Sequence, residues 1–596
     1  WQMQEKRLFD YLYDQLHQYP QEKAFGHKMD GQWRYYSTAE MVGLVNRASR
    51  GLLELGLKPG DKVATVVYQT SPAWVALEIA LCQIGVFNVP MYPTISAREY
   101  EYILRESEAQ YCVVGDGDLY DKVAAAKTKL PGLKEIFSFD KHPVAKHWET
   151  LLYPTPEGAA DQPAQWQFPE VEQVKKSIRP DAVMTLVYTS GTTGNPKGVM
   201  LTHSNIVFNI EALRTMLPFE PGNRVLSFLP VSHIFERVAV YAFTAFGGSV
   251  TFTGTDNLGG DAGDLKAIRP HYFTTVPRLL EKVYEKIVAK GMELKGLKRG
   301  LFFWALALTE HWQFDHRPTG LTALKWKIAD RLIFSKWREA LGGCVKTIIT
   351  GASACPMRVM RTFNAAGIRV SEGYGMTEAA PALSFCRPEP GGTLLCTVGP
   401  LLEGVEVRLV HSPDFREGEG EIVAKSPGVM VGYFQQPEKT AEVLREIDGE
   451  RWLATGDVGT FVEANGRKYL KITDRKKELL KTSHGKYIAP APIESALKEH
   501  ILVEQAMVVG DDFKFVSALI VPAEEALRDW CRRHGIAWTS LSEVIQLPRV
   551  QQRYKKLIER INPQFSKFEQ LKKFVLLPRQ WEPIKTMAPT PSSRRP

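Results

Sequence analysis

The chain has 596 residues, and its 75 Lys+Arg against 67 Asp+Glu give a formal net charge of +8. With 44% hydrophobic and 24% charged residues, the composition is that of a folded globular protein, which excludes a disordered or collagen-like chain, and the length predicts more than one domain. The seven cysteines form no CxxC pair and no cluster with histidine, so neither a disulfide framework nor a zinc site is indicated. The mild positive charge favours anionic ligands or lipid surfaces over dedicated nucleic-acid binding.

No apolar stretch predicts a transmembrane helix, because residues 74–91 contain Glu78 and Gln83 and residues 301–308 are too few to span a bilayer. We expect a cytoplasmic protein with reduced thiols, and peripheral membrane contact and a homodimer both remain open. The chain begins with Trp1 rather than Met, so an upstream targeting signal also remains open.

The first part of the chain alternates helical segments with short apolar runs. Residues 61–68 and 110–115 are predicted to be buried strands, and residues 71–84 an amphipathic helix between them. Strands separated by helices predict parallel sheets with crossover helices, so the expected fold class is α/β. The stretch 154–167, rich in Pro, Gly, Ala and Gln, predicts a surface linker.

Two later segments divide the chain further. The aromatic-rich residues 279–338 predict long helices broken at residues 317–320; they could line a tunnel or belong to the core, and their periodicity favours the core. Residues 471–486 carry six Lys or Arg, and strands at 505–510 and 517–522 follow. We predict a large N-terminal domain, residues 1–473, of parallel and mixed sheets flanked by helices, and a small mobile α+β C-terminal domain, residues 474–596.

The string LVYTSGTTGNPKGVM at residues 186–200 carries the strongest chemical signal. An apolar strand leads into a loop of hydroxyl residues, glycines and one lysine: Thr189, Ser190, Gly191, Thr192, Thr193, Gly194 and Lys197. Glycines allow backbone N–H groups to approach an anion, hydroxyls donate hydrogen bonds and the lysine adds charge, which predicts a polyphosphate cradle. It is not a Walker A loop, because only two residues separate its glycines and the lysine precedes Gly198 rather than Ser or Thr.

At this string the sequence resembles the adenylate-forming acyl-CoA synthetase superfamily of AMP-binding enzymes, and it is most similar to long-chain fatty-acid–CoA ligases. The resemblance runs from about residue 30 to the end, with family motifs in order at residues 229–237, 350–353, 372–378, 431–434, 453–458 and 471–481. It implies activation of a long-chain fatty acid by ATP and Mg²⁺ to an acyl-adenylate. Transfer to coenzyme A would then give acyl-CoA, AMP and pyrophosphate. The long-chain resemblance depends on residues 276–284, 333–337 and 474–490.

Residue types in these motifs suit that chemistry. A tight Gly-Tyr-Gly turn is predicted at residues 373–375, after a strand at 368–370. Tyr374 can stack on a purine, and Glu378, together with Thr189, can hold Mg²⁺ against the phosphates. The resemblance implies that Asp457 accepts hydrogen bonds from the ribose, that Asp474 is the hinge between the domains, and that Lys197 and Glu378 are catalytic. Further ATP or AMP contacts are expected at His233, Gly351, Ala352, Glu372, Gly373, Thr377, Arg475, Lys477 and Lys481. Alone, a basic run predicts a solvated surface and a single histidine a structural role, so these assignments depend on the resemblance.

The tail, MAPTPSSRRP at residues 587–596, departs from the family pattern. Members usually carry a lysine near the end that reaches the site for adenylation, and Ser592 occupies that position here. A neutral serine cannot supply the charge, and losing one cationic donor costs on the order of 10²–10³ in rate. Lys585 could substitute, although Pro589 and Pro591 stiffen the chain between.

The departure leaves several alternatives open. The tail could be altered or redesigned, the chain end misread, or adenylation impaired. The protein could accordingly be a weakly catalytic binder of acyl groups or nucleotide. Within enzymes, the same chemistry could act on an aryl or medium-chain carboxylate.

Overall fold

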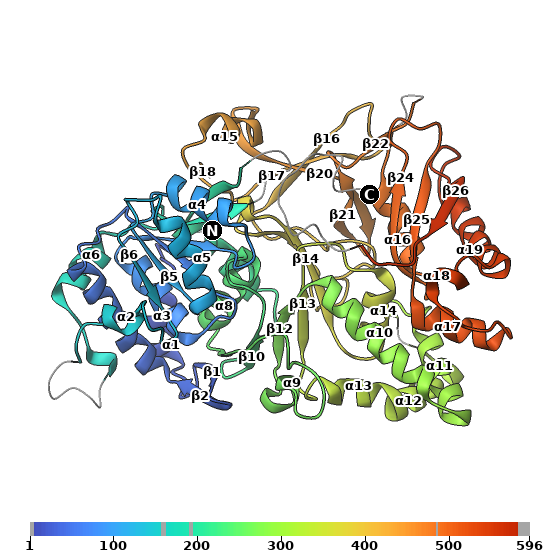
Figure 1. The fold of residues 1–596 in the computed structure, drawn as a ribbon, viewed down its shortest axis with the longest axis horizontal. Coiled ribbons are helices and arrows are strands. Elements are labelled where there is room, and N and C mark those ends of the chain that lie inside the picture. Colours follow the sequence, from blue (N-terminus) through green and yellow to red (C-terminus); the bar gives the residue numbers. More distant parts are fainter. Residues whose placement is uncertain (1–4, 156–162, 190–194, 317, 484–486, 582–596) are drawn as a thin grey trace.

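The structure is a computed structural model that describes residues 5–155, 163–189, 195–316, 318–483 and 487–581. Two eight-stranded sheets and a five-stranded sheet fill the N-terminal part, and a three-stranded sheet lies at the C-terminal side (Figure 1). Helices cover the sheets, so the predicted α/β class is confirmed. No helix in the described part of the chain is long and apolar enough to cross a membrane.

The first large sheet is parallel from β14 to β1 and closes with an antiparallel strand at each edge. In spatial order its strands are β15 (Ala382–Phe385), β14 (Val370–Gly375), β13 (Thr347–Thr350), β12 (Tyr272–Thr275), β10 (Arg224–Ser227), β11 (Ser249–Phe252), β1 (Phe25–Met29) and β2 (Gln32–Tyr36).

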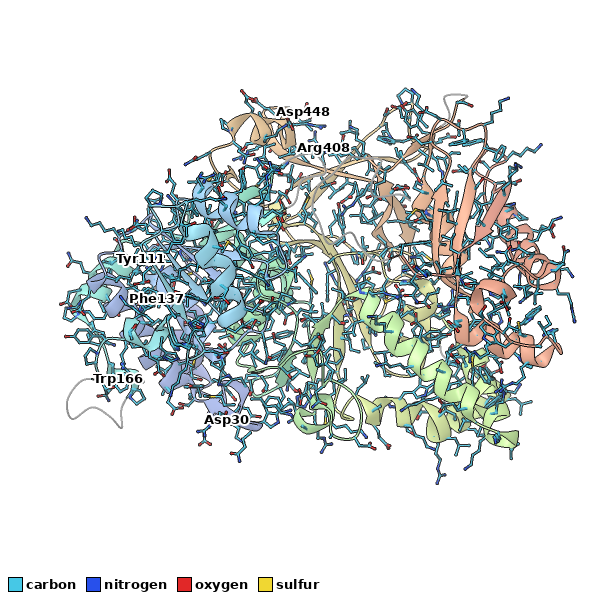
Figure 2. The ribbon with its side chains drawn as sticks, viewed as in Figure 1. Asp30, Tyr111, Phe137, Trp166, Arg408 and Asp448 are labelled. Carbon is cyan, nitrogen blue, oxygen red and sulfur yellow. The ribbon has the colours of Figure 1, made fainter. Side chains whose placement is uncertain are left out.

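The second large sheet is parallel from β8 to β7, with β9 and β18 added antiparallel at one edge. Its order is β18 (Gly432–Tyr433), β9 (Lys197–Thr202), β8 (Val183–Thr189), β4 (Phe87–Met91), β3 (Lys62–Val66), β5 (Tyr111–Val114), β6 (Glu135–Ser138) and β7 (Lys146–His147). The predicted strands at 61–68 and 110–115 are confirmed as β3 and β5. Tyr111 and Phe137, labelled in Figure 2, pair their rings across β5 and β6 with centroids 6.2 Å apart.

The helices around these sheets are mostly crossovers between parallel strands. They are α1 (Asp10–Gln18), α2 (Thr38–Glu54), α3 (Pro72–Gln83), α4 (Ala97–Glu106), α5 (Gly117–Lys127), α6 (Pro169–Ser177), α7 (His203–Arg214), α8 (Ile234–Ala245), α9 (Asp264–Ile268) and α14 (Met357–Ala365). The predicted helix at 71–84 is α3, which Ser71 caps by accepting the Trp74 N–H. Its predicted amphipathic character is wrong, because nearly every side chain of α3, Glu78 included, is buried between neighbouring elements.

A buried ion pair joins the two large sheets. Arg237 of α8 donates to Glu78 of α3, and both side chains are fully buried. Arg237 also donates to the Thr185 hydroxyl of β8 at 2.8 Å, and the Tyr241 hydroxyl donates to Glu78 at 2.7 Å. Because α8 also packs on β10 and β11 of the other sheet, this pair fixes how the two sheets meet.

The segment predicted as long helices is a layer of shorter ones. It comprises α10 (Pro277–Glu293), α11 (Gly296–Thr309), α12 (Gly320–Ala329), the π-helical turn η3 (Asp330–Phe334) and α13 (Ser335–Ala340). A break that the sequence did not predict precedes Gly296, whose φ of +53° suits glycine. Phe302, Phe334 and Trp337 are buried in a core shared with the first sheet, in agreement with the core interpretation.

A third, antiparallel sheet joins this body to the C-terminal part. Its strands are β16 (Glu406–Val410), β17 (Gly420–Lys425), β19 (Leu444–Ile447), β20 (Glu450–Ala464) and β21 (Arg467–Arg475), and α15 (Pro437–Val443) lies beside it. Arg408 and Asp448 form an ion pair of 2.6 Å at its edge (Figure 2).

The C-terminal part has a core of its own, which includes Leu497, Val508, Ile520, Leu527 and Tyr554. Its elements are β22 (Leu480–Lys481), β23 (Tyr487–Ile488), α16 (Pro490–Lys498), β24 (Val503–Val509), β25 (Ser517–Pro522), α17 (Glu524–Arg533), α18 (Leu541–Val544), α19 (Pro548–Ile561) and β26 (Lys573–Leu576). The strands predicted at 505–510 and 517–522 are therefore confirmed. The domain boundary at residue 473 and the mobility of the small domain stay predictions.

The small sheet and its helices pack against the helical layer (Figure 1). Arg278 of α10 reaches Glu504 of β24 at 3.0 Å, and Arg299 of α11 reaches Asp529 of α17 at 2.7 Å. Both carboxylates are almost fully buried while the arginines are partly exposed.

Candidate active site

The β8–β9 hairpin holds the first group of predicted site residues. Thr189 is the last residue of β8 and pairs in register with Lys197, the first residue of β9. The predicted strand is confirmed as β8, but Thr189 and Lys197, which were predicted to be loop residues, lie in the two strands. Ser190, Gly191, Thr192, Thr193 and Gly194 lie outside the described residues, so their contacts with phosphate stay predictions.

Lys197 belongs to a compact charged cluster. Its Nζ lies 4.4 Å from the centroid of the Tyr433 ring, and Tyr433 comes from β18, which pairs with β9. The Tyr433 hydroxyl donates a hydrogen bond of 2.8 Å to Oε1 of Glu378, in the short helix η4 (Thr377–Ala379). Burial lowers the pKa of Lys197; Glu378 opposes that shift and the charge of Lys477 adds to it. Two cations and a carboxylate thus meet at the root of the hairpin.

An apolar pocket, partly open to solvent, lies beside this cluster. Its wall combines one face of α8, the end of α7 and the β13–β15 side of the first sheet. The predicted residues that line it are His233, Gly351, Ala352, Gly373, Tyr374 and Thr377. Its remaining lining is almost wholly apolar: Leu213, Leu217, Ile234, Phe235, Val238, Ala239, Ala242, Phe243, Ile349, Gly375, Met376, Pro381, Ala382 and Phe385.

His233 lies at the start of α8, immediately after the loop that follows β10. Its Nδ1 accepts the Phe235 N–H at 3.3 Å, which caps the helix, and its ring meets Tyr92 edge-on at a centroid distance of 6.5 Å. Burial lowers the pKa of His233, so the imidazole is neutral near pH 7. A neutral ring with its Nδ1 already engaged can offer Nε2 to the pocket.

Residues 372–375 form part of a strand and not the tight turn predicted from Gly-Tyr-Gly. Strand β14 continues to Gly375 because β15 pairs with it antiparallel through a bulge at Tyr374 and Gly375. An added Cβ at Gly375 would lie 1.9 Å from the Pro381 carbonyl oxygen, so the close approach of two chains requires glycine there.

Tyr374 connects the pocket to the third sheet. Its hydroxyl donates to Oδ2 of Asp457 at 2.8 Å, and Arg475 Nε lies 3.3 Å from Oδ1 of the same carboxylate. Burial raises the pKa of Asp457, while Arg475 and Tyr374 oppose that shift. The structure thus brings together three residues that are 83 and 18 positions apart along the chain.

Two predicted contacts lie away from the pocket. Glu372 is buried and its Oε1 accepts the Cys355 N–H at 2.8 Å, so its carboxyl supports the loop before α14 and does not line the pocket. Lys481 lies on β22, with its Nζ 5.3 Å from the Tyr487 ring centroid, and is likewise not part of the pocket wall. The two residues thus lie in family motifs whose strings do not show that these side chains face away from the pocket.

Asp474 lies near the end of β21, just before the C-terminal part. It pairs with Val458 in the third sheet, and its Oδ2 accepts the Ala491 N–H of α16 at 3.3 Å. Burial raises the pKa of Asp474 to about 7. It therefore ties the sheet to the first helix of the small core, although its action as a hinge remains a prediction. Ser592 lies beyond the described part of the chain.

Glu378 would suit a magnesium ion bound together with a triphosphate. Mg²⁺ is usually held by one or two carboxylates together with phosphate oxygens and water. Glu378 offers Oε2 in addition to the oxygen that Tyr433 engages, and among the described residues no group of three or more His, Cys, Asp or Glu would form a self-sufficient cage.

The sequence did not single out Tyr433 or the α7–α8 wall. Tyr433 lies in the Val-Gly-Tyr-Phe motif at 431–434, but nothing local to that motif shows that it bridges Lys197 and Glu378. The α7–α8 wall had a signal: residues 238, 239, 242 and 243 are apolar at helical spacing directly after His233.

Comparisons with known proteins agree with this architecture. The AMP-binding enzyme family matches residues 12–434, and the AMP-binding enzyme C-terminal domain matches residues 477–588. The long-chain-fatty-acid–CoA ligase FadD15 of Mycobacterium bovis is 31% identical over 556 residues, which is 92% of this chain and 88% of that protein. Long-chain-fatty-acid–CoA ligase 6 of Homo sapiens is 32% identical over 532 residues, covering 86% and 73%.

Solved structures show the same fold. ATP-bound MatB from Rhodopseudomonas palustris superposes with a TM-score of 0.69 at 23% identity, covering 97% of this chain and 96% of that one. The anthranilate CoA ligase AuaEII in complex with anthranoyl-AMP gives a TM-score of 0.70 at 17% identity, covering 96% and 94%. The resemblance inferred from the motifs is confirmed, and the chain belongs to the AMP-binding enzymes, the adenylate-forming acyl-CoA ligase superfamily.

Proposed function

We propose that this protein activates a long-chain fatty acid with ATP and transfers the acyl group to coenzyme A. The observation that carries the proposal is the pocket beside the charged cluster. His233, Tyr374 and Thr377 supply its polar groups, whereas the part between α7 and α8 is lined by aliphatic and aromatic side chains. Such a lining suits an unbranched hydrocarbon and would leave polar substituents on a substrate without partners. The names of the FadD15 and human relatives support the same substrate class.

The cluster of Lys197, Tyr433 and Glu378 suits the first half-reaction. A fatty-acid carboxylate oxygen attacks the α-phosphorus of ATP, the bond to the β-phosphate oxygen breaks, and pyrophosphate leaves. Burial chiefly lowers the pKa of Lys197, and the like charge of Lys477 lowers it further. A triphosphate would relieve that repulsion.

Other residues hold the nucleotide and the metal in this proposal. Tyr374 stacks on the adenine and Asp457 accepts from the ribose, so the hydrogen bond between them aligns base and sugar contacts. Mg²⁺, held by Thr189 and Glu378, would offset the charge of the phosphates.

In the second half-reaction the thiol of coenzyme A loses its proton to solvent, its sulfur attacks the acyl carbonyl, and AMP leaves with the bonding electrons. No covalent bond to the enzyme forms in either step. We propose that Asp474 is the hinge about which the C-terminal part turns between the two steps. Its bonds to both Val458 and α16 suit a point where one element moves on another.

Pyrophosphate release from the purified chain, measured over a panel of saturated fatty acids and aryl acids with and without coenzyme A, tests the proposal. We expect release to be fastest with long-chain acids, and acyl-CoA to form when coenzyme A is present. Preference for an aryl or medium-chain acid would contradict the substrate class. Tight binding of acyl groups without release would mean that the chain is a binding protein, as Ser592 would permit.

A further inference from the structure

Helix α12 exposes apolar side chains where a surface helix is expected to be polar. Leu321 is 79% exposed and Leu324 55%, and Ile328 and Leu332 are each 41% exposed. At 3.6 residues per turn, Leu321, Leu324 and Ile328 fall within an arc of roughly 60°, and Leu332 follows four residues later in η3. We call these four residues the apolar stripe.

The opposite side of α12 is anchored in the protein. Ala329 and Phe334 are fully buried, and the Trp326 ring packs on Phe334 at a centroid distance of 5.8 Å. The stripe is therefore held facing outward by its own helix, and α12 lies along the lower edge of the molecule in Figure 1. The helix is apolar on both faces, which is typical of a segment that contacts a second apolar phase.

The exposure is concentrated in this layer. Of the fourteen large apolar side chains exposed in the described residues, five lie between residues 296 and 334: the stripe and Leu297, which is 89% exposed at the start of α11. Isolated exposed apolar side chains need no explanation. About a third of all such side chains in one short stretch of helices indicates a contact surface.

The charges around the stripe select one occupant. Helices α11 and α12 contain no Asp or Glu, and Lys325, Lys327 and Arg331 are exposed beside the stripe. The nearby Asp330 is paired with Arg338 at 2.7 Å. Two copies of such a cationic face would repel each other in a symmetric dimer, whereas an anionic lipid surface would attract the cations and bury the leucines.

We propose that α12 and η3 form an in-plane docking face for anionic lipid bilayers, with the apolar stripe entering the acyl boundary and Lys325 and Arg331 contacting phosphate headgroups. The inference depends on exposure and charge alone and would hold for any substrate of the enzyme. The face lies on the helical layer that also contacts the small sheet, and none of the four stripe residues lines the pocket between α7 and α8.

Flotation of the full chain with phosphatidylcholine vesicles, with and without phosphatidylglycerol, tests this. We expect binding to the anionic vesicles and a loss of at least about tenfold in partitioning for the Leu321→Gln/Leu324→Gln variant. The matched control, Val144→Gln/Phe513→Gln, removes equally exposed apolar groups elsewhere and should bind as the unaltered chain does. Lys325→Gln and Arg331→Gln should each cost roughly fivefold on anionic vesicles only.

Equal flotation of the stripe variant and the unaltered chain would overturn the proposal. An equal loss of flotation in the control variant and the stripe variant would also overturn it. Self-association in analytical ultracentrifugation that the stripe variant abolishes, without vesicle binding, would show that a second copy covers the face instead. Ile328→Asp supplies an independent single variant. Unchanged melting of each variant confirms that a lost signal reports the surface and not the fold.

Discussion

Tyr433 shows at the level of a single residue how the site combines two charges. Its ring lies beneath the Lys197 ammonium and its hydroxyl donates to Glu378, so one side chain holds the cation by its face and the carboxylate by its edge. This arrangement keeps Lys197 and Glu378 apart, so each is available to a phosphate or a metal.

Replacements at this cluster should separate electrostatic from positional effects. Glu378→Gln should slow adenylate formation by about 10² or more while leaving AMP affinity nearly unchanged, because AMP lacks the bridging phosphates. Tyr433→Phe keeps the ring and loses one hydrogen bond, so we expect the rate of adenylate formation to fall by about tenfold or less. Pyrophosphate release measures the rate of adenylate formation, and calorimetry measures the affinity for AMP. Equal losses of both quantities in Glu378→Gln would show that this carboxylate is structural.

Glu236, on the inner side of α8, predicts a pH dependence of stability. Burial raises its pKa from 4.5 to about 7, and the Ser227 and Thr274 hydroxyls donate to it. Because the folded state retains this proton while the unfolded state releases it, stability falls as pH rises from about 4.5 to 7 and levels off above.

The isosteric Glu236→Gln variant should remove that slope, worth on the order of 1–3 kcal/mol between pH 5 and 8. Thermal melting at a series of pH values measures it. The exposed Glu417→Gln variant is the control and should follow the unaltered chain. A Glu236→Gln curve parallel to that of the unaltered chain would contradict the buried protonated carboxyl.

Helix α8 sets the depth of the pocket at the level of elements. Ala239 and Ala242 both line it and lie about 4.5 Å apart along the helix axis, with Ala242 further from His233. A phenylalanine at either position should therefore block the acyl chain at a different depth.

We expect Ala242→Phe to reduce kcat/KM about 10²-fold for the longest acids while medium-chain acids react normally, and Ala239→Phe to shift the limit several methylenes shorter. Each variant is the control for the other, because both add the same ring to the same buried helix. The measurement is acyl-CoA formation against chain length. A uniform loss across all lengths would show that the rings damage the fold and do not gate the chain.

The elements predicted correctly are those whose signal is local. The strands β3, β5, β24 and β25 combine apolar β-branched runs with turn residues at both ends, so each can be predicted from its own residues alone. The turn assigned to residues 373–375 was wrong because β15, which begins only seven residues after Gly375, pairs with this stretch and extends β14 through it. Periodicity could not show that α3 is enclosed on all sides, since that depends on the second sheet.

The same limit applies to the site. Thr189, Lys197, Tyr374 and Glu378 were accessible from the motifs because a Gly- and hydroxyl-rich string restricts the chemistry strongly. The contact from Tyr433 to Glu378 spans 55 residues and could be found only in three dimensions.

At the scale of the whole molecule, two partly buried ion pairs hold the C-terminal part in the observed position. Arg278–Glu504 and Arg299–Asp529 both join the helical layer to that part. If the C-terminal part turns between half-reactions, these pairs favour one orientation over the other.

The Arg278→Met/Arg299→Met variant should change the rate of one half-reaction by about three- to tenfold more than the other. Single-turnover measurements of adenylate formation and of thioester formation from supplied acyl-adenylate separate them. Arg408→Met, which cuts an exposed pair within the third sheet, is the control. Equal changes in both rates would mean that the pairs do not select an orientation.

The Glu78–Arg237 pair has a consequence for how this sequence can drift. Loss of either partner strands a charge in a water-free interior and costs about 3–5 kcal/mol, whereas replacing both with apolar side chains of similar size is often neutral. A change at position 78 or 237 alone is therefore strongly destabilising, whereas a change at both positions to apolar residues is tolerated. These two positions, 159 residues apart, should therefore vary together among related sequences. A related sequence with leucine at position 78 should carry an uncharged residue at position 237.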